Sequence, residues 1–303
     1  MRNIAFAALF ISTALGSAEA QVAGGPAIAY VKVEGSAASI YLTSETGAGT
    51  VKLYTTPSKM TVTTLDMKPG GGELAFVERG KGFAPVLKII RYDDRGIRVG
   101  QPQIVTGACN PDNIDYHPTE PRLLVSDICS QNSRIATMNT NGSGYSVLVT
   151  GSPFLSDARW LKDGISYVYV RAPVDGGALQ ICRNACNPDN GELLRTVSGL
   201  SWMDTARTRN TLLFDEGGTT TSEIDADSGA LLRANFISGT DGHYSPDDLR
   251  VLYETPHSAR GDYLRIRNTD GSFTAVSPKG EYGPKDWRPA AASTSSALDF
   301  RTP

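Results

Sequence analysis

The side chains of this chain that could do chemistry are concentrated in six short segments that mix acids, bases and aromatic residues. The candidate ligand-binding residues are Asp66, Asp115, His117, Arg159, Asp204, His243, Asp286 and Arg288. Carboxylates and guanidiniums placed together can bind a polar ligand through charge-assisted hydrogen bonds. Two acids such as Asp66 and Asp115 could instead perform acid–base chemistry on a sugar. Imidazole with carboxylate would suit zinc or manganese.

Motifs that would define an enzyme are absent or incomplete in the sequence. There is no Gly-x-Ser-x-Gly elbow. The run Gly70-Gly71-Gly72-Glu73 lacks the Lys-Ser/Thr pair of a phosphate-binding loop. A nucleophilic triad needs Ser, His and an acid in mutual reach, and the chain has 3 histidines, of which we expect His257 to lie in an exposed loop. These observations favour a protein that is not an enzyme, and we expect no cofactor and no bound metal.

The six segments recur at spacings of 41 to 49 residues, and each is followed by a turn and a hydrophobic strand. They are Asp66-Met67-Lys68-Pro69, Asp115-Tyr116-His117-Pro118, Arg159-Trp160-Leu161-Lys162, Trp202-Met203-Asp204-Thr205, His243-Tyr244-Ser245-Pro246 and Asp286-Trp287-Arg288-Pro289. Self-similarity in this range, with four strands in each repeat, is typical of a β-propeller blade. Turns rich in Asp, Asn and Gly separate the later strands of each repeat.

The two ends of the repeat region predict how the ring closes. The first repeat begins at its second strand, around residues 27–31, whereas residues 285–288 form a first strand with nothing after it. Pairing of this last strand with the N-terminal blade would close the ring and remove open sheet edges. We therefore predict an all-β, six-bladed propeller of four-stranded antiparallel blades over residues 21–289, followed by a flexible tail over residues 290–303.

Alignment of the inner strands predicts which side chains face the channel. We align them on Pro69, Pro118, Lys162, Thr205, Pro246 and Pro289. Large side chains then stand two positions before each anchor, at Met67, Tyr116, Trp160, Met203, Tyr244 and Trp287. Since side chains alternate along a strand, we expect this set to pack between blades and its mostly polar neighbours to border the channel. Those neighbours would either bind a ligand at the channel mouth or only bond each other.

The ends of the chain and its composition limit the location and partners. Arg2, the apolar run over residues 4–15 and Ala18-Glu19-Ala20 match a signal peptide over residues 1–20. A net charge of −3 argues against nucleic acid as a partner, and no other segment is long and apolar enough to enter a bilayer. We expect an exported monomer, in the periplasm or secreted.

The 4 cysteines of an exported protein predict disulfides. Cys109 and Cys129 flank a hairpin whose turn lies near Pro118, so we expect them to face each other, which leaves Cys182 to pair with Cys186. A metal site on the second pair is the alternative, but no neighbouring His or second Cys pair completes four ligands.

The repeat resembles that of the TolB-type propellers of bacterial periplasms, in which an aromatic-Ser-Pro-Asp-Gly turn precedes an apolar strand. The best copies are Tyr244-Ser245-Pro246-Asp247, Trp287-Arg288-Pro289 and Trp160-Leu161-Lys162-Asp163-Gly164, and Ile40-Tyr41-Leu42-Thr43 matches the third-strand element. The resemblance covers about residues 27 to 289. It implies a six-bladed ring, a periplasmic location and a non-enzymatic role in binding proteins.

Three functions follow from these patterns. The first is a periplasmic interaction module that binds a cell-envelope protein or peptide at the channel mouth. The alternative is an enzyme or sensor, metal-assisted or not, that acts on a carbohydrate or another small molecule in the channel. The third is a scaffold without a small ligand.

Overall fold

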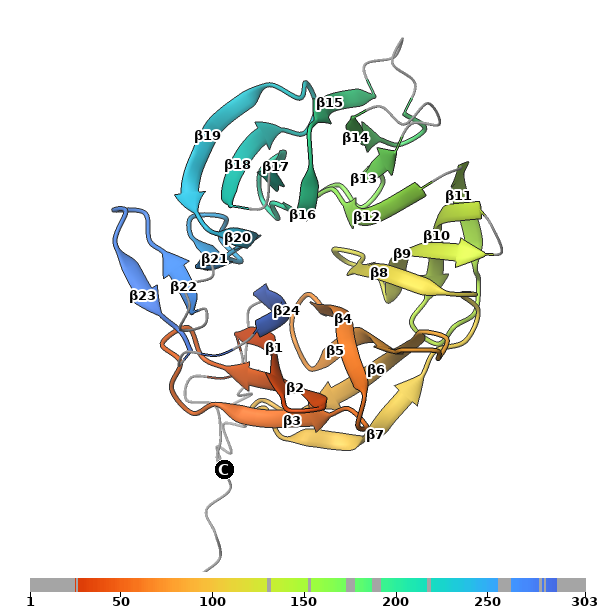
Figure 1. Cartoon of the computed structure of the whole chain (residues 1–303), viewed down its shortest axis with the longest axis vertical. Helices are drawn as coiled ribbons and strands as arrows, with labels where there is room; N and C mark the ends of the chain where they lie inside the picture. Colours follow the sequence, from red (N-terminus) through yellow and green to blue (C-terminus); the bar gives the residue numbers. More distant parts are fainter. Residues whose placement is uncertain are drawn as a thin grey trace, which may run out of the picture.

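Every regular element in the described part of the chain is a β-strand. The computed structural model describes residues 25, 27–129, 132–151, 154–172, 178–186, 192–216, 219–255, 263–277, 280 and 282–287. The strands form six four-stranded antiparallel sheets, arranged as blades around a central axis (Figure 1). This confirms the predicted all-β, six-bladed propeller. None of the described residues forms a helix long and apolar enough to cross a membrane.

Each blade runs from an inner strand beside the channel to an outer strand at the rim. Blade 1 contains β24 (Tyr282–Trp287), β1 (Ile28–Glu34), β2 (Ala37–Thr43) and β3 (Val51–Thr55); blade 2 contains β4 (Met60–Met67), β5 (Glu73–Gly80), β6 (Val86–Tyr92) and β7 (Arg98–Ile104); blade 3 contains β8 (Pro111–Tyr116), β9 (Arg122–Cys129), β10 (Asn132–Asn139) and β11 (Ser146–Gly151). Blade 4 contains β12 (Phe154–Trp160), β13 (Tyr167–Ala172), β14 (Leu179–Arg183) and β15 (Leu193–Val197); blade 5 contains β16 (Leu200–Thr205), β17 (Thr211–Glu216), β18 (Thr220–Asp225) and β19 (Leu231–Ser238); blade 6 contains β20 (Thr240–Tyr244), β21 (Val251–Glu254), β22 (Leu264–Arg267) and β23 (Phe273–Ala275).

The ring closes through the last strand of the chain. β24 pairs with β1, with Trp287 opposite Ile28 and Asp286 opposite Ala29. The Trp287 side chain is buried in an apolar cluster with Ile28 and with Ile266 of blade 6. Closure by the C-terminal strand is therefore confirmed, and it fixes blade 1 against blade 6 through apolar burial.

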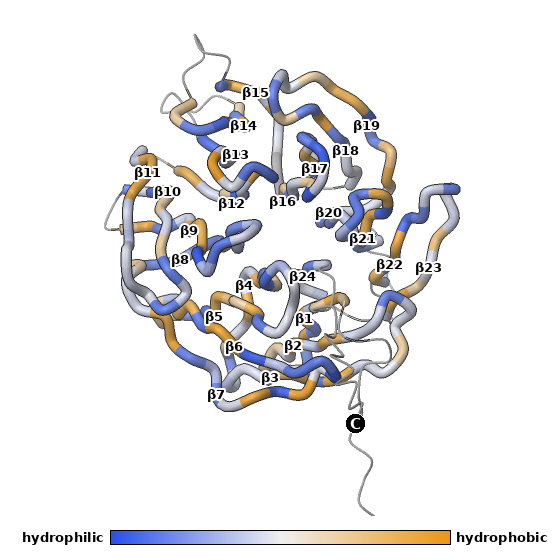
Figure 2. Tube along the Cα trace, turned by 180° about the vertical axis from the view of Figure 1, so that it is seen from behind, coloured by the Kyte–Doolittle hydropathy of each residue, from blue (hydrophilic) through white to orange (hydrophobic). Residues whose placement is uncertain are grey.

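The core lies between the blades because one face of each sheet packs on the next. One apolar cluster joins Val77 and Leu87 of blade 2 to Tyr116 and Leu123 of blade 3. Apolar and polar residues alternate along many strands (Figure 2), as expected where one face is buried against a neighbour. All six large inner-strand residues are buried as predicted: Met67, Tyr116, Trp160, Met203, Tyr244 and Trp287.

The predicted alignment of the fifth inner strand is wrong by two residues. Asp204 stands opposite Leu213 in β17, just as Asp115 stands opposite Leu124 in β9. The first turn bond of blade 5 runs from Ala206 N–H to the Thr211 carbonyl and matches the bond from His117 N–H to the Arg122 carbonyl in blade 3. The anchor position therefore belongs to Arg207 instead of Thr205.

This shift replaces Met203 with Thr205 in the large column. Met203 is still buried between blades, two positions earlier on the same face of the strand.

Both predicted disulfides are present. Cys109 pairs with Cys129 across the β8–β9 hairpin at a Cα–Cα distance of 5.4 Å, and Cys182 pairs with Cys186 at 5.0 Å. The predicted signal peptide, the predicted tail, His257 and Arg288 lie outside the described residues.

Candidate functional site: the central channel and its mouth

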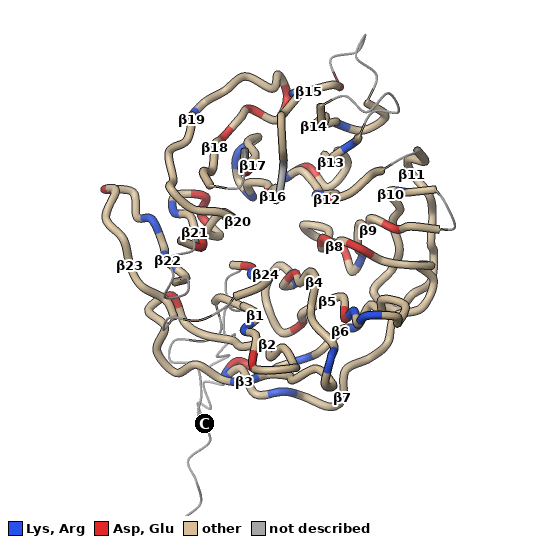
Figure 3. Tube along the Cα trace, viewed as in Figure 1, with Lys and Arg blue, Asp and Glu red and all other residues tan. Residues whose placement is uncertain are grey.

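Six side chains, one from each inner strand, form what we call the inner ring. They are Asp66, Asp115, Arg159, Asp204, His243 and Asp286, and each is at most 4% exposed. Figure 3 shows acidic positions on β4, β8 and β24 around the centre of the propeller. The structure thus brings together six of the eight predicted site residues.

Each aspartate of the inner ring bonds the backbone of the next blade. The Oδ2 atoms of Asp286, Asp66, Asp115 and Asp204 accept the N–H groups of Met67, Tyr116, Trp160 and Tyr244 at 2.7, 2.5, 2.7 and 2.9 Å, respectively. An inner strand has no neighbouring strand on its channel side, so these N–H groups need an acceptor. The four carboxylates therefore join blades as well as line the channel.

Arg159 also links neighbouring blades, but it donates hydrogen bonds to backbone carbonyls instead of accepting them from N–H groups. Its Nε donates to the Met203 carbonyl at 3.1 Å, and its Nη1 donates to the Ile114 carbonyl at 2.8 Å. The guanidinium carbon lies 4.6 Å from the centre of the Trp202 ring, a cation–π distance. Thr205 completes this joint, because its hydroxyl donates to the Trp160 carbonyl at 2.8 Å.

His243 occupies the remaining place in the inner ring. Its Nδ1 lies 3.8 Å from Asp286 Oδ1, and neither ring nitrogen has a hydrogen-bond partner within the described part of the chain. Burial, together with the positive charges of Lys285, Arg159 and Arg207, holds the pKa of His243 well below its ordinary value. His243 is therefore neutral at physiological pH.

Burial also keeps protons on the acids of the inner ring. It raises the pKa of Asp204 to about 6, and burial with the nearby charge of Asp66 raises the pKa of Asp115 to about 7. The pKa of Asp286 is raised well above its usual range by burial, by the charge of Asp66 and by a hydrogen bond to Asp66. Four acids face two arginines here, and protonation reduces the excess negative charge.

At one end of the channel lies a pocket of about 290 Å³, which we call the mouth pocket. Its lining residues are Pro69, Gly70, Pro118, Thr119, Lys162, Arg207 and Pro246. Five of them are the anchor residues of successive inner strands, which places the pocket on the channel axis. This geometry supports the corrected position of Arg207 independently of the strand pairing.

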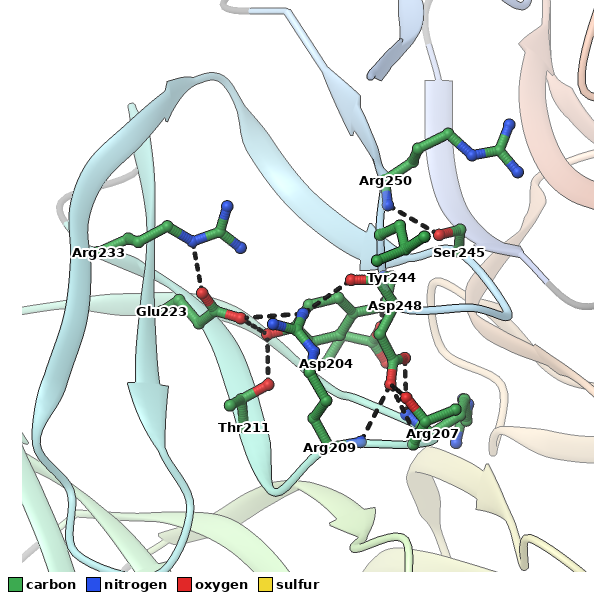
Figure 4. A network of polar contacts seen from close by, with 12 residues as sticks. Asp204, Arg207, Arg209, Thr211, Glu223, Arg233, Tyr244, Ser245, Asp248 and Arg250 are labelled. Atoms are coloured by element: carbon green, nitrogen blue, oxygen red, sulfur yellow. Dashed lines mark hydrogen bonds and ion pairs between the residues drawn. The ribbon is translucent and has the colours of Figure 1, made fainter. Parts of the chain in front are cut away.

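Arg207 connects the mouth pocket to the inner ring. Burial opposes its charge, but the carboxylates of the ring outweigh that effect and raise the pKa of Arg207. Asp248 holds the backbone there, because its carboxylate accepts the N–H groups of Arg207, Thr208 and Arg209 at 2.7, 2.6 and 3.1 Å (Figure 4). Nη2 of Arg207 has no hydrogen-bond partner among the described residues. Arg207 is thus a fixed cation below the mouth.

His117, also predicted in the site, lies in the turn after β8 instead of the inner ring. Its Nδ1 accepts the N–H groups of Thr119 and Glu120 at 3.2 and 3.0 Å, so Nε2 carries the proton and donates to the Gly164 carbonyl at 2.8 Å. Both nitrogens are used to hold the turn beside Thr119 of the mouth pocket. Its predicted ligand-binding role is not tested by this arrangement.

The sequence pattern did not predict that Arg207 and Lys162 line the mouth pocket or that Asp248 holds the backbone beside it. The available signal was the pair Leu212-Leu213, which matches Leu123-Leu124 of blade 3 in the second strand. Aligning the blades on their second strands would have placed Arg207 at the anchor position.

No protein-family model and no curated protein sequence matches this chain. The fold and the axial channel define a six-bladed β-propeller, and several solved structures are similar to it in fold. TolB from Acinetobacter baumannii superposes with a TM-score of 0.68 at 19% identity, over 87% of this chain and 67% of that chain.

Two further solved structures of different proteins are similar to this chain in fold. A nidogen/laminin complex matches with a TM-score of 0.62 at 9% identity, over 88% of this chain and 100% of that chain. An oligogalacturonate lyase in complex with manganese matches with a TM-score of 0.51 at 14% identity, over 82% of this chain and 74% of that chain. The chain is therefore a TolB-like propeller in fold.

Proposed function

We propose that this protein is a periplasmic binding module that receives a segment of a cell-envelope protein or peptide at the channel mouth. The observation that carries the proposal is the mouth pocket, which the turns of five blades form on the axis above Arg207. Concave sites with a few fixed polar groups are common recognition sites.

The chemistry of the mouth suits an acidic segment with apolar neighbours. Lys162 and Arg207 line the pocket, whereas the acids of the same turns are engaged with backbone: Asp163 accepts the N–H groups of Ile165 and Ser166 at 2.9 and 2.8 Å. Three prolines frame the opening. Ile165 in the first turn of blade 4 and Leu249 in the first turn of blade 6 are 80% and 63% exposed and offer apolar contact to a partner.

The location and the structural neighbours support the same function. Two disulfides suit an oxidising compartment, and the N-terminal pattern over residues 1–20 suits export. The nidogen structure contains a second protein, laminin. The resemblance to TolB-type propellers also favours a protein partner.

The alternative is an enzyme or sensor acting on a carbohydrate, as the similarity to a lyase suggests. It would need accessible acids, but Asp66 and Asp286 are buried, share a hydrogen bond and hold backbone N–H groups of the next blade. Metal assistance lacks a fitting ligand set in the described residues. The one cluster there, Cys109, Asp127 and Cys129, contains both sulfurs of a disulfide. These observations favour binding over catalysis.

Site-specific photo-crosslinking in periplasmic extract tests the proposal. A photoreactive residue replaces the exposed Thr119 in the mouth pocket, and a matched probe replaces the exposed Thr150 on outer strand β11. We expect one protein adduct with the Thr119 probe, lost on Lys162→Glu but retained with Lys81→Glu at an exposed position. Equal labelling by both probes, or an adduct insensitive to Lys162→Glu, would overturn the proposal.

A further inference from the structure

The contact between blades 5 and 6 carries a row of arginines that runs outward from the mouth pocket. We call this region the 5–6 joint, and it consists of Arg209, Glu223, Arg233, Phe236, Arg265, Arg267 and Phe273. The whole chain has a net charge of −3, so this concentration of positive charge stands out against an acidic background.

The inner half of the 5–6 joint is only partly neutralised. Glu223 accepts Arg233 Nε at 2.5 Å and lies 3.3 Å from Arg209 Nη2, and it also accepts the Tyr244 hydroxyl of blade 6 at 2.6 Å (Figure 4). One carboxylate therefore serves two guanidiniums, whose side chains are 40% and 42% exposed. Burial opposes ionisation of Glu223, but the bonds from Arg233 and Tyr244 lower its pKa, so it is charged. One positive charge is left over.

Among the described residues, no acid compensates the outer half of the 5–6 joint. Arg265 and Arg267, the blue positions of β22 in Figure 3, alternate with the buried Leu264 and Ile266 and so share one face of blade 6. Arg265 hydrogen-bonds Tyr253, and in the described part of the chain neither arginine has a carboxylate within ion-pair distance. No described carboxylate neutralises either charge, which would suit an anionic partner.

Aromatic side chains lie between these arginines. The Phe236 ring centre is 3.9 Å from the Arg233 guanidinium and 5.6 Å from that of Arg267. Phe273 pairs directly with Arg267 across the β22–β23 hairpin and is 57% exposed. Arginine and aromatic residues are the types enriched where protein interfaces are most tightly packed. The Arg233 guanidinium over the Phe236 ring would compete with a sugar for stacking there.

We propose that the 5–6 joint binds an extended acidic segment of a partner protein, with its carboxylates on Arg265 and Arg267 and an apolar side chain against Phe273. This inference rests on the proposed function, because the segment that enters the mouth pocket continues outward along the joint. Arg207 and Lys162 hold its inner end. Three positive charges of the joint are not neutralised by Glu223, and they would bind the outer part of the segment. Opposite charge also speeds the encounter with the acidic partner.

Fluorescence anisotropy tests the inference with a labelled decapeptide of alternating glutamate and tyrosine as the probe. The test variant is Arg265→Gln/Arg267→Gln. The matched control is Lys81→Gln/Arg98→Gln, which removes the same charge from exposed positions of blade 2. We expect at least a fivefold loss of affinity in the test variant, less than twofold in the control, and a shallower salt dependence in the test variant only. Equal losses in the two variants would overturn the inference.

A mouth variant separates this inference from the proposed function. If Lys162→Glu weakens binding but Arg265→Gln/Arg267→Gln does not, the 5–6 joint is excluded and the mouth proposal stands. If only the joint variant weakens binding, the joint is supported and the mouth proposal falls. Full displacement of the peptide by an equal charge concentration of oligogalacturonate would overturn the assignment to an acidic polypeptide. Circular dichroism melts of all variants check that each is folded.

Discussion

The carboxylate of Asp204 accepts the backbone N–H of Tyr244 at 2.9 Å and so joins the inner strands of blades 5 and 6. The same bond recurs from Asp66, Asp115 and Asp286 to the next blade. A buried N–H without an acceptor is costly. The acids of the inner ring are therefore structural links between blades, and they support the mouth pocket from below.

Loss of one such link should destabilise the whole ring. Asp204→Ala leaves the Tyr244 N–H without its acceptor, and we expect a loss of about 2 to 3 kcal/mol in unfolding free energy. Asp204→Asn keeps an oxygen in place and should lose less than half as much. Urea denaturation measures both, and equal stability of wild type and Asp204→Ala would show that the link is dispensable.

Stability should fall as pH rises from 7 to 8.5. The pKa of Asp115, about 7, and that of Asp286, well above its ordinary value, are raised mainly by burial. Folded protein then holds protons that the unfolded chain has already released, so this stabilisation is full below about pH 4 and is lost as pH rises through the folded pKa values. Acids with a lowered pKa, such as Glu34 at about 2, respond at much lower pH. His243 is neutral in the folded state across this window.

Thermal melts at pH 7 and 8.5 check this prediction with two variants. Asp115→Asn removes a titrating group from the inner ring, so the difference between its melting temperatures at pH 7 and pH 8.5 should be smaller than in wild type. Asp94→Asn, at an exposed turn position, should leave the difference unchanged. A larger pH dependence in Asp115→Asn than in wild type would contradict the assignment.

The sequence was sufficient for the architecture because closure depends on features that it shows directly. The lone strand around Trp287 and the incomplete first repeat predicted the pairing of β24 with β1. Both disulfides also followed from strand order. The alignment failed at β16, because Met203 offered a large apolar side chain two residues out of register and no proline marked Arg207. Because the error was of two residues and side chains alternate along a strand, Asp204 stayed on the face predicted for it.

The contacts of the channel could not be predicted from the sequence. Asp204 and Tyr244 belong to different blades, and the distance between them depends on how the blades pack. Whether His117 holds a turn or faces the channel likewise depends on Gly164 of the next blade. Sequence pattern predicts the face of a strand, and packing decides which polar atoms meet.

Lys285 should be essential for the closing strand. Its side chain is fully buried and reaches Asp241 at 3.3 Å and Glu254 at 3.1 Å, both in blade 6. Lys285→Met removes the buried cation that these two acids share, and we expect a loss of about 3 kcal/mol. The double variant Lys285→Met/Glu254→Gln should recover part of that loss, whereas additive losses in urea denaturation would exclude an energetic coupling.

The two disulfides should contribute unequally to stability. Cys109 and Cys129 are 20 residues apart and Cys182 and Cys186 are 4 apart. Loop-closure entropy then predicts losses of about 3 and about 2 kcal/mol for Cys→Ser replacement of each pair. Guanidinium denaturation of the two double variants measures the order, and a larger loss for the Cys182–Cys186 pair would contradict it.

The central claim is that the inner ring is a closed, buried support and that the mouth pocket is the surface open to ligands. An NMR titration of the Asp115 side-chain carboxyl carbon tests it most directly. We predict a midpoint near 7, since burial raises the pKa of Asp115 to about 7. A midpoint near 4 would mean that water reaches this carboxylate, and the acids of the channel would then themselves be exposed binding groups.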